Sequence, residues 1–330
     1  MKIYFLGDLH FSDNNEWSIP SIEKFIEWFH SLYIEPNSIL IQLGDVFDRA
    51  ANYGITIKLV TQFFRIASQK FEKIYVLGGN HDFVFRKNIY QYATNYLNES
   101  FENIHFIYRH IILEVNNKTI ALFPFQKIPG KILDKYYSEE LENVYYNCDI
   151  VCGHVGIEEK GTFFGGMNIS KFKPDTKFIL GHIHTRNGQY KNYYTGSILP
   201  FKINEDQTEE PRILNIYDID TNTFSSINIP KIIKFEIANF GDTLHDLDKP
   251  DDGLIRLYTI KNCKHLHEAK SQYPNYYIYN IEKPNKIDNK ISVSKQNLLM
   301  TPQEALSLMI KEQKIILKRK TLQVIQELLN

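Results

Sequence analysis

The chain has 330 residues, enough for one large or two smaller domains. An apolar fraction of 43% is ordinary for a globular protein, and a formal net charge of −1 excludes a global positive field that would attract nucleic acid. Cys148, Cys152 and Cys263 fit no disulfide framework and are expected to be buried thiols in a reducing compartment. The first residues do not resemble a signal peptide, and no apolar run has the length of a membrane span. We therefore expect a cytoplasmic protein with no membrane partner.

Strands and helices alternate through the first half of the chain. Apolar runs at 2–6, 38–43 and 73–77 are each followed by a glycine and predict buried strands. Between them, apolar residues recur at helical spacing: Ile22, Phe25, Ile26 and Phe29, then Leu59, Phe63, Ile66 and Ala67. This order predicts a βαβαβ unit with a mostly parallel sheet. Further strands are predicted at 105–109, 111–115, 119–125, 149–153, 177–181 and 192–196.

The chain changes character beyond residue 211. Residues 212–229 predict a β-hairpin with a polar turn, and 231–282 predict short strands with few helical signals. A linker rich in Lys and Asn then leads to a segment that opens with a capping box from Thr301 to Glu304. Apolar residues recur in it every seven positions, at Leu308, Ile315, Leu322 and Leu329. The segment predicts a terminal helix that either packs on its own domain or docks in a groove of another protein.

Polar motifs follow five of the predicted strands. They are Asp8 and His10 in GDLH, Asp45, Asp48 and Arg49 in GDVFDR, Asn80, His81 and Asp82 in GNHD, His154 in GHV, and His182 and His184 in GHIH. Because loops at the carboxyl edge of an open α/β sheet converge, we expect these side chains to share one site. The two pairs spaced i, i+2 would point to the same side in extended backbone.

These side chains form a coherent set of metal ligands. Three or four imidazoles, two carboxylates and an amide oxygen suit manganese, iron or zinc, and they exceed the needs of one ion. A carboxylate such as Asp45 can bridge two ions. A single motif of this kind is usually ordinary surface or turn chemistry. Jointly, in this order and each behind a strand, the motifs predict a dinuclear metal site.

Over residues 1–200 the motifs D-x-H, G-D-x-x-D, G-N-H-D/E, an isolated G-H and G-H-x-H resemble the calcineurin-like metallophosphoesterase superfamily. The resemblance implies an α/β fold, a four-layer αββα sandwich with a dinuclear centre between its two sheets. It implies that Asp8, His10, Asp45 and His184 hold one ion and that Asp45, Asn80, His154 and His182 hold the other. Manganese is the expected metal, and magnesium, iron and zinc are the alternatives.

The resemblance also implies roles for residues that do not bind metal. In two-metal phosphoester hydrolysis, His81 would protonate the departing alkoxide. Asp48 would hold the His81 imidazole in its productive tautomer, and Arg49 would contact the phosphate. Asp82 is expected to cap the turn.

The superfamily cleaves both monoesters and diesters, so the fold does not decide the substrate. The GDLHF start and the turn Tyr194-x-Gly196-Ser197-x-x-Pro200 resemble the SbcD/Mre-type nuclease subunit, and the compact length resembles its phage members, the recombination endonuclease subunit. This implies a metal-dependent DNA exonuclease/endonuclease of double-strand-break repair and recombination, acting with an SMC-like ABC-type ATPase, in the host cytoplasm if phage-encoded. The alternative is a stand-alone phosphatase or small-molecule phosphodiesterase, because GDVFDR suits both classes.

The expected domain organisation follows from the same resemblance. Residues 1–230 would form the nuclease domain, 231–285 a small α+β capping domain that steers DNA, 286–300 a linker, and 301–330 a C-terminal helix that docks on the ATPase partner. Helices over 55–70 and 86–98 are candidate surfaces for a homodimer, or else their apolar faces pack on the sheet.

Overall fold

The structure is a computed structural model that describes residues 1–49, 54–86, 89–125, 145–157, 167–186, 193–200, 211–239, 254–261 and 277–280. The chain divides into two compact units, Met1–Ile281 and Glu282–Asn330. All described residues belong to the first unit. The predicted linker at 286–300, the predicted helix at 301–330 and Cys263 lie outside the described residues.

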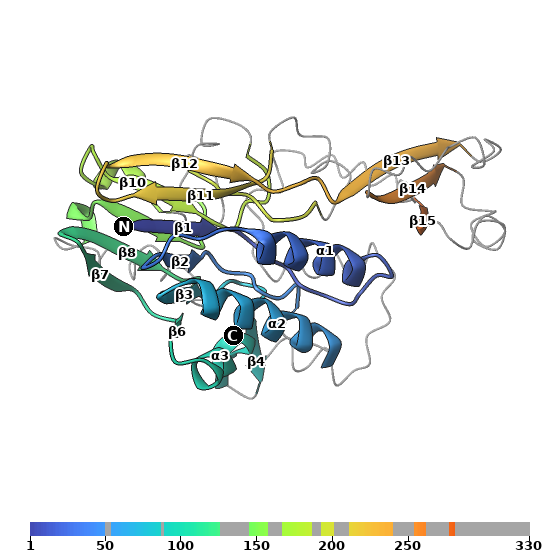
Figure 1. Ribbon diagram of the computed structural model, residues 1–330, viewed down its shortest axis with the longest axis horizontal. Coiled ribbons are helices and arrows are strands. Elements are labelled where there is room, and N and C mark those ends of the chain that lie inside the picture. Colours follow the sequence, from blue (N-terminus) through green and yellow to red (C-terminus); the bar gives the residue numbers. More distant parts are fainter. Residues whose placement is uncertain are drawn as a thin grey trace, which may run out of the picture. The chain divides into compact units, whose positions relative to one another are not determined.

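The first sheet has six strands in the order β12-β11-β1-β2-β3-β6 (Figure 1). Their bounds are Lys2–Leu6 (β1), Ile39–Gln42 (β2), Lys73–Leu77 (β3), Ile104–Ile107 (β6), Ile213–Asp218 (β11) and Thr223–Asn228 (β12). β1, β2, β3 and β6 are parallel, and the hairpin β11–β12 adds to β1 in antiparallel orientation. Helices α1 (Ser18–Ser31) and α2 (Gly54–Lys70) connect the first three strands, which confirms the predicted βαβαβ unit and the predicted hairpin.

The second sheet has four strands in the order β10-β9-β8-β7. Their bounds are Ile111–Val115 (β7), Lys118–Phe123 (β8), Ile150–Gly153 (β9) and Lys177–Leu180 (β10). β8, β9 and β10 are parallel, whereas β7 pairs with β8 in antiparallel orientation. Cys148 and Cys152 are buried free thiols, as expected from the composition.

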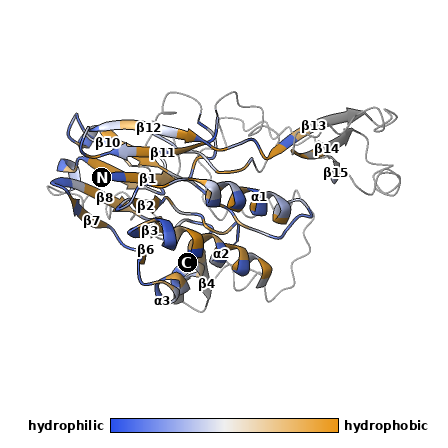
Figure 2. Cartoon of the chain, viewed as in Figure 1, coloured by the Kyte–Doolittle hydropathy of each residue, from blue (hydrophilic) through white to orange (hydrophobic). Residues whose placement is uncertain are grey.

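Strand side chains alternate between separate hydrophobic cores. In β1, Tyr4 and Leu6 belong to the core that the helices cover, whereas Ile3 and Phe5 belong to a core with Leu122 and residues of the second sheet. A strand buried on both faces requires this period of two. In Figure 2, α1 and α2 each have an apolar side and a polar side. The two sheets therefore pack face to face, with α1 and α2 outside the first.

The outer face of the second sheet has a third core. Phe123, Val151 and Leu180 pack there with residues of the connecting segments. In the described part of that layer the connections are loops and the short 3₁₀ turns η2 (Tyr145–Asn147) and η3 (Ile169–Lys171). The predicted α/β class and the pair of packed sheets are confirmed. Helices in the fourth layer stay a prediction, because 126–144 and 158–166 lie outside the described residues.

A third sheet follows the sandwich in sequence. Its parallel strands are β13 (Ile233–Asn239), β14 (Ile255–Lys261) and β15 (Tyr277–Asn280). Ile233 and Leu257 are fully buried in the core that contains the α1 residues. The ring centroids of Trp17 and Phe235 are 6.4 Å apart in an edge-to-face arrangement. The strands predicted beyond residue 230 are thus present, and the domain boundary at that residue stays a prediction.

Two predicted elements differ in the structure. The helix expected over 86–98 is wrong: β4 (Phe83–Arg86) and β5 (Ile89–Tyr92) form a hairpin, followed by the 3₁₀ turn η1 (Ala93–Asn95) and the short helix α3 (Tyr96–Ser100). Alternating aromatic and β-branched residues favour strands over a helix here. The strand expected at 192–196 is reduced to an isolated bridge between Leu180 and Tyr194, because the chain turns at Gly196, where φ is 75°.

None of the helices in the described ranges combines the length and the apolar character that crossing a membrane requires.

A substitution at Phe63 of α2 tests the packing of the core beneath the helices. Its side chain is fully buried, and its ring centroid lies 4.8 Å from that of Phe29 and 5.1 Å from that of Phe64. We expect Phe63→Ala to lower the free energy of unfolding by about 3–5 kcal/mol, since it leaves a cavity, as measured by chemical denaturation. Ile57→Ala, on the same helix at a side chain that is 42% exposed, should stay within about 0.5 kcal/mol of the unaltered chain. Equal losses in both variants would contradict this assignment of the buried face.

Candidate metal centre

The carboxyl ends of strands from both sheets meet at one place. Asp8, Asp45 and Asn80 follow β1, β2 and β3 of the first sheet, while His154 and His182 follow β9 and β10 of the second. Asn80 Oδ1 lies 2.9 Å from His154 Nε2 and 2.9 Å from His182 Nδ1. His10 Nε2 lies 3.0 Å from His184 Nε2. The structure thus brings side chains from all five motifs together, as the carboxyl-edge rule predicts.

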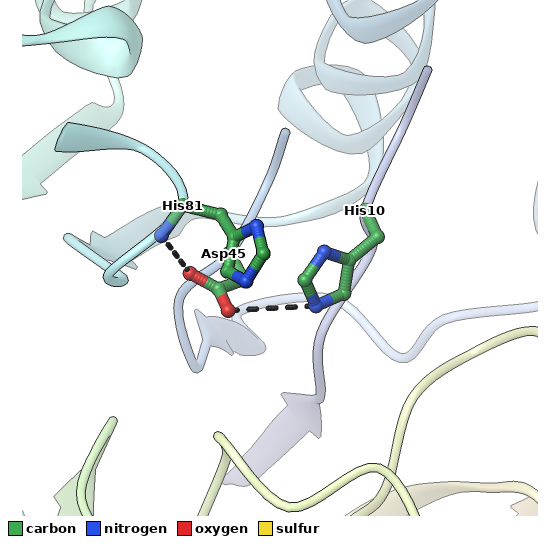
Figure 3. Close-up of side chains that lie close together, drawn as sticks. All are labelled: His10, Asp45 and His81. Carbon is green, nitrogen blue, oxygen red and sulfur yellow. Dashed lines mark hydrogen bonds and ion pairs between the residues drawn. The ribbon is translucent and has the colours of Figure 1, made fainter. Parts of the chain in front are cut away.

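Asp45 is shared by two groups of candidate metal ligands. Its Oδ2 lies 3.4 Å from His10 Nε2 and 3.2 Å from His154 Nε2. His10, Asp45 and His81 form one group, shown in Figure 3, and Asp8, Asp45 and His154 form the other. Within each group the ligand atoms all lie within 4.8 Å of one another. Asp45 therefore has the position of a carboxylate that bridges two ions.

The hydrogen bonds of His154 show that a cation fits this centre. Its Nδ1 lies 2.8 Å from the carbonyl oxygen of Leu43, which only accepts, so Nδ1 carries the proton. In the neutral imidazole, Nε2 then presents a lone pair to Asn80 Oδ1 and Asp45 Oδ2, which bear lone pairs themselves. A positive charge between these atoms, from a proton or a metal ion, stabilises this arrangement. Nitrogen and oxygen donors of this kind suit borderline and hard divalent cations.

Burial and charge act on the titrating groups of the centre. Asp8 and His154 are fully buried, and Asp45 and His10 nearly so. Burial lowers the pKa of His10 to about 4, which keeps its imidazole in the neutral form that binds metal. Burial also lowers the pKa of His154, but the carboxylates of Asp45 and Asp8 outweigh it and raise that pKa well above its ordinary value. Conversely, burial raises the pKa of Asp45, and His154 outweighs it and holds that pKa below its usual range.

Three ligand candidates have left-handed backbone conformations. The φ angles are 45° for His10, 52° for Asp45 and 82° for His182. The remaining described non-glycine residues with positive φ are all asparagines: Asn37, Asn116, Asn117 and Asn222. For a non-glycine residue this region costs on the order of 1–3 kcal/mol, and such residues cluster at functional sites. The expected extended backbone at the two i, i+2 pairs is therefore wrong, because a turn at His10 and at His182 sets the direction of the side chains.

Asp82 joins the loops of the second and third motifs. Its carboxylate is fully buried and accepts hydrogen bonds from the backbone N–H of Phe47 (3.0 Å) and of Gly79 (2.9 Å). A Cβ on Gly79 would lie 2.1 Å from Asp45 Oδ1, so only glycine permits the close approach of these two loops. Asp82 caps its own turn, as expected, and in addition fixes the loop that carries Asp45.

His81 lies beside the ligands, and its contacts differ from those expected. Its backbone N–H donates to Asp45 Oδ1 at 2.8 Å, and its Nδ1 lies 2.5 Å from the backbone oxygen of Asp48. The Asp48 carboxylate instead accepts from Asn14 Nδ2 at 2.7 Å and lies 3.7 Å from His10 Nδ1. The orienting contact expected from the Asp48 side chain is thus made by its carbonyl group. Arg49 is 72% exposed, with Nε 3.8 Å from Asp48 Oδ2.

The turn at 194–200 contacts the first and last motifs directly. The backbone N–H of Ile198 donates to the backbone carbonyl oxygen of Asp8 at 3.0 Å, and that of Ser197 donates to the backbone carbonyl oxygen of His184 at 3.1 Å. Arg212 Nη1 in turn donates to the Ser197 carbonyl and hydroxyl, both at 2.7 Å. In the sequence the turn is only a point of resemblance, and no local motif marks Arg212 or Asn14 as part of the site.

Fold and site together define an α/β sandwich with a centre that can hold divalent metal ions. The family model described as calcineurin-like phosphoesterase matches residues 1–186. The chain therefore belongs to the calcineurin-like phosphoesterase family, whose members are metal-dependent hydrolases. The individual ligand assignments remain predictions.

The solved structures that are similar to the chain include two of low sequence identity. One, described as a novel archaeal phosphodiesterase, has 16% identity and a TM-score of 0.34, with 69% of this chain and 99% of that chain covered. The other, a protein of unknown function from Aquifex aeolicus, has 19% identity and a TM-score of 0.31, with 53% and 87% covered. At these TM-scores neither similarity bears on activity. No curated protein matches the chain.

Because Asp45 belongs to both ligand groups, its loss should affect both of the ions that the resemblance implies. We expect Asp45→Asn to reduce bound manganese from about two ions per chain toward none, since the amide carries no charge and bridges poorly. Elemental analysis after dialysis against manganese measures the content. Arg49→Ala, at an exposed side chain outside both groups, should keep the full content. A variant at Asp45 that retains both ions would remove that residue as the bridge.

Metal affinity should rise with pH. In the metal-free protein, Asp45 and Asp8 raise the pKa of His154, so above its ordinary value of about 6.5 the imidazole still holds a proton that a metal ion must displace. The affinity should therefore increase from about pH 6.5 upward, until the pH passes the raised pKa. Calorimetric titration with manganese, in two buffers of different ionisation enthalpy, measures both the affinity and the protons released. A flat affinity with no proton release would contradict the competition.

Proposed function

We propose that this chain hydrolyses phosphodiester bonds in DNA, as a nuclease subunit of recombination and double-strand-break repair. The observation that carries the hydrolytic part is the meeting of five strand-end motifs around Asp45, with His81 beside them. Family membership supports phosphoester hydrolysis. The choice of DNA rests on sequence resemblance to the SbcD/Mre-type nuclease subunit.

We assign the proposed ligands of the centre to two cations. Asp8, His10, Asp45 and His184 would hold one divalent cation, and Asp45, Asn80, His154 and His182 the other. Bound there, the cations would neutralise phosphate charge and lower the pKa of a water molecule that serves as nucleophile. Manganese is the proposed metal.

His81 is the proposed general acid. The Asp48 carbonyl accepts from Nδ1–H whether the imidazole is neutral or charged, so this contact orients the ring in both states. Nε2 is then the atom that can carry a proton to a departing alkoxide. The hydrogen bond from the His81 backbone N–H to Asp45 Oδ1 holds this residue next to the shared ligand.

Two further features support DNA as the substrate. The turn at 194–200, which resembles that of the nuclease subunits, packs on the Asp8 and His184 loops. A separate sheet, β13–β15, follows the sandwich at the place in sequence where those nucleases carry a DNA-steering domain. The proposed protein partner is an SMC-like ABC-type ATPase bound through 301–330, and a homodimer is a further proposed assembly.

A stand-alone phosphatase or small-molecule phosphodiesterase is the second candidate. The exposed Arg49 guanidinium next to Asp48 favours it, because an arginine at the rim of a metal centre can bind the terminal phosphate of a monoester. The two candidates differ in substrate and not in metal chemistry.

A substrate comparison separates the two candidates. With manganese, we expect the full chain to degrade linear duplex DNA and to hydrolyse a chromogenic phosphate monoester only weakly. His81→Asn should lower the turnover of DNA by about 10²–10⁴-fold while metal content stays unchanged, because a general acid is lost and none of the ligands assigned above to the two cations is. Strong monoester hydrolysis without DNA cleavage would favour the phosphatase. Unchanged turnover in the variant would remove His81 from its role.

A further inference from the structure

Gln42 is a polar residue at a position that the strand pattern assigns to the apolar core. It is the last residue of β2 and is fully buried, and the alternation of the strand places it on the same side as Leu40, toward the helices. A buried amide is costly unless its polar atoms are hydrogen-bonded. The partners of this side chain therefore indicate what it is for.

The Gln42 amide forms hydrogen bonds with the two glycines that directly precede the candidate ligands Asp8 and Asp45. Nε2 donates to the carbonyl oxygen of Gly44 at 2.7 Å and to that of Gly7 at 3.3 Å, while Oε1 accepts from the backbone N–H of Gly44 at 3.1 Å. Carbonyl oxygens only accept and the backbone N–H only donates, so the orientation of the amide is determined. One side chain thus holds both peptide groups of Gly44 and also reaches the neighbouring strand.

The geometry of Gly44 makes this contact consequential. Its φ is 101°, a conformation that suits glycine, and a Cβ there would lie 2.4 Å from His154 Nδ1. Asp45, directly after it, is itself left-handed at 52°. At Asp45 the backbone oxygen accepts from the backbone N–H of Leu9 (3.0 Å) and of His10 (2.9 Å), and at Gly44 the Gln42 amide supplies hydrogen bonds. Gly7, the other glycine that the amide contacts, directly precedes Asp8.

We propose that Gln42 is a positioning residue of the metal centre, whose amide fixes the backbone segments that present Asp8 and Asp45 relative to each other. It contacts neither substrate nor ion and acts through the two carboxylates. The inference rests on the metal centre of the proposed function and not on DNA as the substrate. Residues that orient metal ligands in this indirect way typically contribute about 10–100-fold to metal affinity.

The test compares Gln42→Met with Asn103→Leu. Methionine has nearly the length of glutamine but neither the N–H groups nor the carbonyl. Asn103 is a matched control, because its Nδ2 also donates to two backbone carbonyls, those of Ser68 (3.0 Å) and Phe71 (2.9 Å). It precedes β6 and so lies at the amino edge of the sheet, opposite the centre. Manganese binding to the full chain without substrate is measured by electron paramagnetic resonance, and the thermal unfolding midpoint is measured without metal.

We expect Gln42→Met to lose about 10–100-fold in manganese affinity and to replace the spin-coupled signal of an ion pair by that of isolated ions. Asn103→Leu should stay within about two-fold of the unaltered chain, although both variants lower the unfolding midpoint. Wild-type affinity and coupling in the first variant, or an equal loss in the second, would overturn the proposal.

A second variant covers the case in which Gln42→Met is insoluble. Gln42→Glu keeps the length and the acceptor for the Gly44 N–H and is read by the same criteria. If neither variant folds, the proposal is overturned, because Gln42 then serves the fold as a whole. An unaltered chain that binds no manganese overturns it together with the metal centre. A chain that binds manganese but does not cleave DNA contradicts only the nuclease proposal.

Discussion

The accumulation of electron-pair donors around one buried carboxylate is the constraint on which the rest of the structure depends. Asp45 has His10 and His154 within 3.4 Å, and Asp8 is buried close by. In a medium of low dielectric such groups repel one another unless positive charge lies between them. The Leu43 carbonyl holds the only proton of neutral His154 on the far side of its ring. The site is therefore built for cations, and the fold has to hold it against its own repulsion.

The fold meets this demand with a rigid frame and cross-connected loops. Two packed sheets direct their strand ends to one place, and three loop residues adopt left-handed conformations that isolated peptides rarely hold. Asp82 connects the second and third loops, and Gln42 connects the first and second. The turn at 194–200 connects the first loop with the last. Hydrogen bonds between loops thus compensate for the strain within them.

The sequence was sufficient wherever a single physical rule dominates. Strands β1, β3 and β7 begin and end at the predicted residues because apolar runs bounded by turn-forming residues leave little choice. Convergence of the motifs follows from sheet geometry alone. The hairpin at 83–92 was missed because helical and strand patterns compete in a short aromatic segment. Spacing carries no information on φ at His10 or His182. The contact between His81 and the Asp48 carbonyl uses a backbone group that every residue has, so the side chains in the sequence do not predict it.

The sequence separation of the ligands has a consequence for folding. His10 and His184 touch although 174 positions separate them, and the residues between them build half of the first sheet and all of the second. Contacts this distant along the chain form late, after the entropy of closing the intervening loops has been overcome. A newly made chain therefore cannot bind its cations in the native manner until the sandwich is assembled. Metal ions would then bind the folded chain and not the unfolded one. The concentration of available metal would therefore set the fraction of molecules that stay folded.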